Sequence, residues 1–376
     1  MTQEEFLELC AEGDYKQVSD AISSGIDPNV RGNMGGHKIP PIFVAASSGN
    51  KGAIKALTEH GVDCADGFSA AIAGRKKSLI KYLVRCGGDI NAIDSFGYTP
   101  ILTAATMNMT DYLELLISLG ADVNAKSGLG YNALTFASFL ASSPQREELD
   151  PKIISILMKN GSDYYEAMLI AVKTGNVEFA NLLIKEGADV NLLDEEDRSF
   201  VMYSVMVEPE NLPNGLFNPV LRVLLENGAD PDFPDSKGRT PLMIAVINNE
   251  LDSSVIETLL EFGADIDATD DKGLTALMWA VAGVNKVPDI MMPALIRTGG
   301  MRANGWERWC AFIALSIAVK HELQIDVVRR LIEYGADVNI IDKSGMNAIM
   351  YALMDGDDET ADILSDAGAQ IIFDLN

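Results

Sequence analysis

The chain has 376 residues, 48% of them hydrophobic, and carries 55 Asp and Glu against 29 Lys and Arg, a net charge of −26. The apolar fraction is sufficient for a continuous core, which excludes wholesale disorder. The acidic balance disfavours direct binding to nucleic acid or to an anionic membrane surface, since both rely on basic residues. It would attract a protein partner with a basic surface, or it simply keeps an elongated protein soluble.

Scattered cysteines and histidines argue against a metal centre. Neither the four cysteines nor the three histidines show the short spacing that a structural zinc site needs. The sequence also lacks the nucleophile, phosphate-binding and metalloprotease motifs of enzymes, so we expect no catalysis and no cofactor. An acidic N-terminus without an apolar core and the lack of a long apolar run predict a cytoplasmic protein.

The first predicted element is a helix pair over residues 4–24, with no turn before it. Glu4, Glu5, Glu8 and Glu12 are expected on its solvent-facing side. Such a polar face is required of the terminal unit of a stacked array, because no neighbouring unit covers it.

The fourth unit along the chain shows the pattern that repeats. Asp94–Tyr98 is polar, contains a glycine and predicts a tight turn. Thr99 and Pro100 suit the N-cap and the first position of a short inner helix. Apolar residues at helical spacing predict a second helix over 109–118, which Gly120 ends as a left-handed C-cap.

Glycines that end such apolar stretches recur eleven times, and most precede a small residue, an Asp and an Asn. They are Gly25, Gly61, Gly87, Gly120, Gly161, Gly187, Gly228, Gly263, Gly299, Gly335 and Gly368. The Asp and Asn that follow favour a turn, because their side chains bond their own backbone.

The motif Gly-Ala-Asp-Val-Asn, with Thr-Pro-Ile-Leu at 99–102 and Thr-Pro-Leu-Met at 240–243, resembles the ankyrin repeat. The resemblance implies an all-α solenoid of about eleven helix-turn-helix units with short β-hairpin loops. It covers nearly the whole chain as a single array over 1–376, with an N-terminal cap (1–25), internal repeats (26–335) and a C-terminal cap and tail (336–376). The histidine with which the family links neighbouring turns is absent, so looser turns are expected.

Unequal spacings between the terminal glycines predict departures from the regular repeat. The stretches 62–87 and 162–187 are too short for a hairpin, so two units are expected to lack one. Insertions are predicted between the two helices of the fifth, seventh and ninth units, at 142–150, 208–217 and 283–288. Loops often carry function, but lengthening a loop also costs little free energy, so the insertions alone assign no role.

Ankyrin-like arrays bind partners on their concave side, through hairpin tips and inner-helix ends, and the resemblance carries this surface to the matching positions. The apolar positions of the fourth and fifth units are Phe96, Tyr98, Met107, Leu129, Tyr131 and Phe139. The other positions are Glu195, Glu196 and Arg198 in the seventh unit, Lys237 and Arg239 in the eighth, Asp271, Lys272 and Leu274 in the ninth, and Trp306 in the tenth.

Two interpretations of the tips stay open. A tip that meets only water should be polar, so Phe96, Tyr98, Leu129 and Tyr131 favour an interface with a partner. Alternatively, each ring packs on the neighbouring hairpin. The acidic tip of the seventh unit and the basic tip of the eighth predict ion pairs between neighbouring tips.

The main hypothesis is a non-enzymatic scaffold that binds a protein partner on the concave hairpin and inner-helix surface. The alternative is an acidic inhibitor that imitates nucleic acid and blocks a basic nucleic-acid-binding protein. The alternative requires acidic side chains to cluster on one face, and it predicts loss of binding at high salt.

Overall fold

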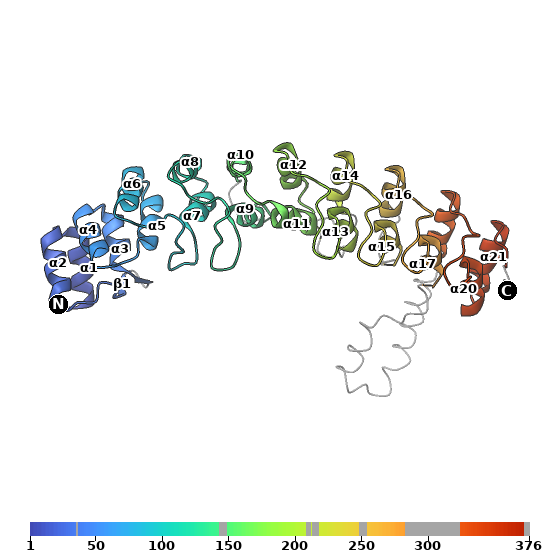
Figure 1. Cartoon of the computed structure of the whole chain (residues 1–376), viewed down its shortest axis with the longest axis horizontal. Helices are drawn as coiled ribbons and strands as arrows, with labels where there is room; N and C mark the ends of the chain where they lie inside the picture. Colours follow the sequence, from blue (N-terminus) through green and yellow to red (C-terminus); the bar gives the residue numbers. More distant parts are fainter. Residues whose placement is uncertain are drawn as a thin grey trace, which may run out of the picture. The chain divides into compact units, whose positions relative to one another are not determined.

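The structure, a computed structural model, describes residues 1–34, 37–142, 149–207, 212, 218–247, 254–282 and 324–371. The chain divides into two compact parts, which we describe separately. Figure 1 labels most of the helices of both parts. The N-terminal part comprises Met1–Ala171 and Glu178–Ala188, and the C-terminal part comprises Val172–Val177 and Asp189–Asn376. The architecture is all-α and confirms the predicted repeat of helix pairs.

Helices of the N-terminal part pair as the inner and outer helices of successive repeats. Each inner helix from α1 to α9 contacts the next inner helix, and among the outer helices α2 contacts α4, α4 contacts α6, and α8 contacts α10. The pairs are α1 (Gln3–Glu12) with α2 (Tyr15–Ser23), α3 (Pro41–Ser48) with α4 (Lys51–Glu59), α5 (Ala65–Ala73) with α6 (Lys77–Arg85), α7 (Pro100–Thr106) with α8 (Thr110–Ser118), and α9 (Ala133–Ala141) with α10 (Pro151–Lys159). The boundary between the parts runs through α11 (Tyr165–Thr174) and α12 (Val177–Lys185).

The C-terminal part continues the same arrangement. Its inner helices α13, α15, α17 and α20 contact one another in a row. The helices are α13 (Phe200–Met206), α14 (Pro219–Glu226), α15 (Pro241–Ile247), α16 (Ser254–Glu261), α17 (Ala276–Ala282), a helical segment over 324–333, α20 (Ala348–Asp355) and α21 (Asp358–Asp366).

Local sequence explains where the helices begin and end. The Thr99 hydroxyl accepts the Leu102 N–H and caps α7, with Pro100 at its first turn. Gly120 follows α8 with φ of 93°, in the left-handed region, although no atom lies within 4 Å of the place where a Cβ would stand. Backbone conformation, not lack of space, therefore selects glycine there. Ten of the eleven predicted glycines share this conformation, and Gly299 lies outside the described residues.

The Asp and Asn after each glycine have different tasks. The Asp122 carboxylate accepts the Asn124 N–H within its own turn, as predicted. Asn124 instead joins two repeats, because its Nδ2 donates to the Gly161 carbonyl at 3.0 Å and its Oδ1 accepts the Asp163 N–H at 2.7 Å. Side-chain bonds of this type connect successive repeats along each part.

The predicted hairpins are mostly hydrogen-bonded turns. One two-stranded antiparallel sheet joins β1 (Gly32–Met34) to β2 (His37–Ile39), and an isolated bridge joins Leu193 to Ser199. These are the strand pairings found in the described part of the chain.

Neighbouring turns are linked through their backbones. The Gly128 N–H donates to the Gly97 carbonyl at 2.8 Å, and the Ser236 N–H donates to the Glu196 carbonyl at 3.2 Å. The tips therefore stack without the family's histidine, and the loosening expected from its absence is not observed at these positions.

Two repeats lack a hairpin, as predicted. Cys64 directly precedes α5, and α11 begins three residues after Ser162. The first gap is spanned by a side chain, since the Arg31 guanidinium donates to the Ser95 hydroxyl at 2.6 Å. Asp66, at the start of α5, accepts both the backbone N–H and the hydroxyl of Ser95.

Hydrogen bonds join the ninth tip to residues that follow Gly335, and residues 300–323 of the predicted tenth unit lie outside the described ranges. The Asp337 N–H donates to Asp267 at 2.9 Å, and the Lys343 N–H donates to the Lys272 carbonyl at 2.9 Å. Helix α17 also contacts α20. The side chain of Gln324, at the start of the helical segment 324–333, donates to the carbonyl groups that end α17, which makes this segment the outer helix of the ninth repeat.

Two predicted insertions lie between the helices of their repeats. The insertion 142–150 separates α9 from α10, and 208–217 separates α13 from α14. Most of their residues lie outside the described ranges, as does all of 283–288. Among the described residues, the Asp150 N–H donates to the Asn108 side chain, and Leu212 is buried.

The two end repeats have the polar faces expected of caps. Glu4, Glu5, Glu8 and Glu12 are exposed on α1. Of the acids in the last repeat, Asp355, Asp358 and Glu359 are exposed, whereas Asp357 is half-buried. Both patterns agree with helices that no further described repeat covers.

Candidate protein-binding surface

Two large apolar side chains are exposed at neighbouring tips of the N-terminal part. Phe96 is 58% exposed and Leu129 is 75% exposed. Each occupies the third position of its turn, and the hydrogen bond between Gly97 and Gly128 holds the two turns together. Exposure of adjacent apolar groups is unfavourable in water, so these tips differ from ordinary polar turns.

The turns that present these side chains are built by one acceptor each. The Asp94 carboxylate accepts the N–H groups of Phe96 and Tyr98, both at 2.9 Å, and it also accepts the Ser69 hydroxyl. Ser127 takes this role in the fifth repeat, where its hydroxyl accepts the N–H groups of Leu129 and Tyr131 at 3.3 and 3.2 Å. Both turns therefore have a fixed backbone below an exposed apolar tip.

Aromatic pairs lie beneath the two tips. The ring of Tyr98 meets Phe136 of the next inner helix edge to face, with centroids 5.6 Å apart. Tyr131 meets Phe139 in the same geometry at 5.2 Å. Tyr98 and Tyr131 are thus half-buried, and each packs on a phenylalanine of the inner helix α9 and not on the neighbouring hairpin. Phe139 itself remains 41% exposed.

We define the apolar tip surface as Phe96, Tyr98, Met107, Leu129, Tyr131 and Phe139. Met107, at the end of α7, is 41% exposed, as is Phe139 near the end of α9. The six residues come from the turns and inner helices of two repeats whose inner helices are in contact.

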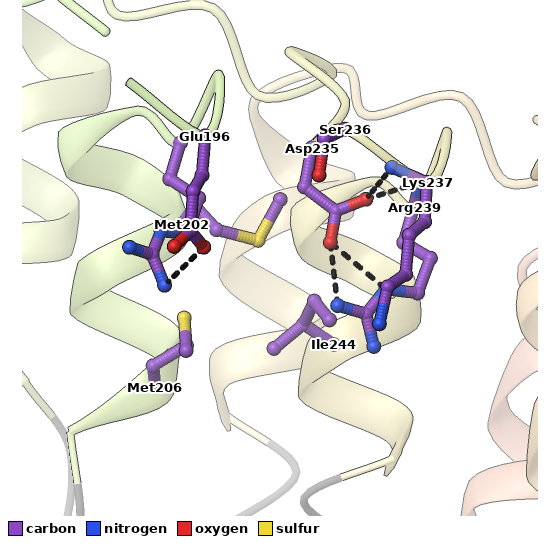
Figure 2. A pocket seen from close by; sticks show the side chains of 9 residues that line it. Glu196, Met202, Met206, Asp235, Ser236, Lys237, Arg239 and Ile244 are labelled. Atoms are coloured by element: carbon purple, nitrogen blue, oxygen red, sulfur yellow. Dashed lines mark hydrogen bonds and ion pairs between the residues drawn. The ribbon is translucent and has the colours of Figure 1, made fainter. Parts of the chain in front are cut away.

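A small pocket of about 80 Å³ lies between the seventh and eighth tips (Figure 2). Its apolar lining comes from Met202, Met206 and Ile244. Its polar lining comes from Glu196, Arg198, Asp235, Ser236, Lys237 and Arg239. Such a volume accommodates a single side chain of a partner, not a small-molecule substrate.

The ion pairs at this pocket form within each turn. Arg198 pairs with Asp194 at 2.9 Å and with Glu196 at 3.1 Å. Arg239 pairs with Asp235 at 2.5 Å, as Figure 2 shows. The predicted pairing with the acidic seventh tip is therefore wrong for Arg239, which closes its own turn, and no ion pair of Lys237 is found among the described residues.

Hydrogen bonds lower the pKa of two turn carboxylates, Asp194 and Asp235. Burial alone would raise the pKa of Asp194, but hydrogen bonds from Tyr203, Arg198 and the Glu196 N–H outweigh it and lower the pKa to about 2. The pKa of Asp235 is also lowered, because donation by Arg239 and the Lys237 N–H outweighs burial. Both groups stay ionised at neutral pH and serve the fold.

The residues predicted for the ninth tip differ in their exposure. Asp271 and Lys272 are exposed, and Glu195 of the seventh tip is exposed as well. Leu274 is buried, with 8% of its surface exposed, so its assignment to the partner-binding surface is wrong. The apolar side chain lies inside the repeat, where a partner does not reach it. Trp306 lies outside the described residues.

Sequence reasoning missed two exposed side chains at inner-helix ends. Met206 is 41% exposed at the end of α13, and Ile247 is 36% exposed at the end of α15. Both occupy the same position in their inner helix as Phe139 does in α9, so aligning the repeats in the sequence is the signal that predicts their exposure.

The remaining chemistry is sparse in the described ranges. They contain no cluster of three His, Cys, Asp or Glu side chains able to hold a metal, and no helix there has the length and apolarity to cross a bilayer. Cys10, Cys64 and Cys86 are not in disulfides. Burial raises the pKa of Cys10 and of Cys64 to about 12, so these thiols are poor nucleophiles.

Comparison with known proteins agrees with the repeat geometry. A family model for ankyrin repeats in three copies matches residues 68–149, 212–292 and 291–373, and a model for a single ankyrin repeat matches 165–195. Ankyrin repeat and SOCS box protein 6 of Mus musculus is 32% identical over 104 residues, 26% of this chain and 23% of that protein. The Homo sapiens protein of that name is 33% identical over 103 residues, 25% and 23% of the two chains.

A bacterial relative shows the same motif. A putative ankyrin repeat-containing protein of Treponema pallidum (strain Nichols) is 40% identical over 77 residues, 20% of this chain and 24% of that protein. The chain thus matches about a quarter of the length of these curated relatives. Because the family models cover more than half of the 376 residues and the fold repeats the same helix pair, the chain belongs to the ankyrin repeat family.

Proposed function

We propose that this protein is a non-enzymatic scaffold that binds a protein partner through the apolar tip surface. Ankyrin repeats generally mediate protein–protein interaction. The observation that carries the proposal is the contrast at the third position of the turn. Phe96 and Leu129 are apolar and exposed there, whereas the other described turns have Glu196, Lys237, Lys272 and Ser344.

The size of these side chains suits them to be anchors. A fully buried interface anchor of this size contributes about 2 kcal/mol or more to binding. The turns of Phe96 and Leu129 are already fixed by hydrogen bonds to Asp94 and Ser127, so a partner orders little backbone on contact. A preformed apolar patch of two neighbouring tips therefore fits one protein surface.

The charge of the other tips supports a partner with basic groups beside its apolar contact. Glu195, Glu196 and Asp271 are exposed, and the whole chain carries a net charge of −26. Long-range attraction of this kind raises association rates and decreases with salt. No nucleic acid or membrane is required as a direct partner.

The alternative of a nucleic-acid mimic has less support. Asp94, Asp194, Asp235, Asp270 and Asp342 each accept backbone N–H groups of their own turn. These acids recur with the repeat because the turn needs an acceptor at that position. A nucleic-acid mimic would instead need acidic side chains that face solvent at the spacing of the phosphates of nucleic acid.

Affinity purification with mass spectrometry, at about 50 mM and about 300 mM NaCl, tests the proposal. We compare the wild type with F96S/L129S and with the matched control I341S/M354S, which removes two apolar side chains that are 47% and 74% exposed. The proposal expects partners that are retained at high salt and lost only with F96S/L129S. Equal retention by both variants contradicts it, and capture that disappears at high salt for all three proteins favours the acidic mimic.

A further inference from the structure

The overall negative charge conceals a basic segment near the N-terminus. Residues 31–88 contain nine Lys and Arg against three Asp and Glu, a net charge of +6. The remaining residues therefore carry −32. A local excess of this sign is unexpected in an acidic chain with Asp at the first position of most described turns.

The basic residues gather on two neighbouring outer helices, α4 and α6. Lys51 and Lys55 lie one turn apart on α4, and Lys77, Lys81 and Arg85 lie one turn apart on α6. All five are exposed, and α4 contacts α6 within the N-terminal part (Figure 1). Residues four apart share one face of a helix, so each helix presents a row of cations. We call these five residues the basic ridge.

Tyrosines of adjacent outer helices hold three of these lysines. The Lys51 ammonium lies 5.4 Å from the ring centroid of Tyr82 on α6. Lys55 lies 5.2 Å from the ring of Tyr15. The third contact joins Lys77 to Tyr112 on α8, also at 5.2 Å. Cation–π contacts fix long side chains before a ligand arrives, so less side-chain entropy is lost on binding.

The ridge is only partly neutralised by carboxylates. Lys55 lies 3.8 Å from Glu59, and Lys77 lies 3.0 Å from Asp111. Within the ranges that the structure describes, no carboxylate lies at ion-pair distance from Lys81 or Arg85. The far end of α6 therefore keeps two exposed cations, Lys81 and Arg85.

We propose that the basic ridge binds a short acidic segment of another protein. A nine-residue helix is about 14 Å long, and packed helices lie about 8–10 Å apart, so the ridge covers only a few side chains of a ligand. Charges four residues apart on a helix are about 6 Å apart along its axis, which suits successive Asp and Glu side chains of a peptide. The ridge thus recognises a partner of opposite charge to the one that the acidic tips attract.

The size of the ridge disfavours larger polyanions. A nucleic acid strand or an anionic bilayer extends well beyond two helices. The residues outside 31–88 carry a net charge of −32, so most of the surface that it would touch is acidic. At physiological salt, charges are screened beyond about 8 Å, so acids of neighbouring repeats have little effect on a ligand that stays on the ridge. A longer polyanion extends beyond the ridge and comes close enough to those acids to be repelled. A segment of a few acidic residues avoids this repulsion.

Fluorescence anisotropy with a labelled hexaglutamate peptide tests the proposal on the full chain at about 50 mM NaCl. We compare the wild type with K81E/R85E and with the control K152E/K159E, which makes a matched change of charge on α10, where both lysines are also exposed. The proposal expects K81E/R85E to weaken binding at least about tenfold and the control to weaken it less than about threefold. Thermal unfolding by circular dichroism checks that both variants fold.

Three outcomes overturn the proposal. The first is no binding of hexaglutamate by the folded wild type, and the second is an equal loss of affinity in both variants, which indicates only a general charge effect. The third is tighter binding of a single-stranded oligonucleotide or of phosphatidylserine vesicles that depends on Lys81 and Arg85. That result assigns the ridge to a different class of ligand.

Discussion

Replacement of Asp94 by alanine tests how the apolar tip surface is built. Asp94 is 7% exposed, and its carboxylate accepts the N–H groups of Phe96 and Tyr98 and the hydroxyl of Ser69. Alanine removes all three acceptor contacts and leaves the buried Ser69 hydroxyl and two part-buried N–H groups without this acceptor. The turn that carries Phe96 should therefore lose its fixed backbone.

The expected loss of stability follows from these three contacts. Hydrogen bonds to a charged group contribute about 1.5–3 kcal/mol each, and bonds within one turn are not additive, so we expect D94A to lose about 3 kcal/mol. The variant D94S should lose only about 1 kcal/mol, because the Ser127 hydroxyl already closes the neighbouring turn through two N–H groups.

Urea denaturation followed by circular dichroism measures both losses, and hydrogen exchange of amides 94–98 locates them. The order D94A, then D94S, then wild type in increasing stability supports the role of the acceptor. D94A within about 0.5 kcal/mol of the wild type refutes it, and so does a D94S variant that is as unstable as D94A.

Three further changes probe other parts of the fold. N124A removes the two bonds from Asn124 to Gly161 and Asp163 and should lose about 1–2 kcal/mol in urea denaturation, whereas loss at or below about 0.3 kcal/mol contradicts a linking role. The pKa of Asp194 is about 2 in the folded protein and about 4 in the unfolded chain. Ionised Asp194 therefore stabilises the fold fully above about pH 4, and this stabilisation is lost as the pH falls toward about 2. D194N should therefore cost about 1 kcal/mol at pH 7, after allowance for solvent screening, and close to nothing at pH 2 in melts of the two proteins. L274D should lower the melting temperature sharply because Leu274 is buried, while K272D at the exposed neighbouring position should leave it nearly unchanged.

The regular part of the fold could be predicted because its signals are local. Gly120 and the other terminal glycines need a left-handed backbone, and Thr99 with Pro100 begins a helix by its own chemistry. Missing hairpins at 62–87 and 162–187 followed from length alone. Each of these signals acts within a few residues, so a single sequence contains it.

Contacts between residues far apart in the sequence could not be predicted from such signals. Gly299 follows an apolar stretch at a spacing close to the regular period, but it lies outside the described residues. The contact between Asp267 and Asp337 joins residues 70 apart, and only the folded chain reveals it. Local patterns count potential repeats but do not establish which ones are neighbours.

The site shows the same limit. The exposure of Phe96 and Leu129 is one of the two outcomes that the sequence left open. Leu274 occupies the fifth position of its turn, where Tyr98 and Tyr131 are half-buried, and a smaller apolar side chain there is enclosed. The basic ridge was missed because the net charge of −26 was used as an average over the whole chain. A count by segment contains that signal.

Site-specific photo-crosslinking tests the central claim most directly. A photoreactive phenylalanine analogue replaces Phe96 in one protein and the exposed Ile341 in another, and each is irradiated in cell extract with and without the L129S substitution. Binding through the apolar tip surface predicts one main crosslinked protein from position 96, absent from position 341 and lost with L129S. The same crosslinked proteins from both positions, or a crosslink at 96 that L129S does not change, would contradict the claim.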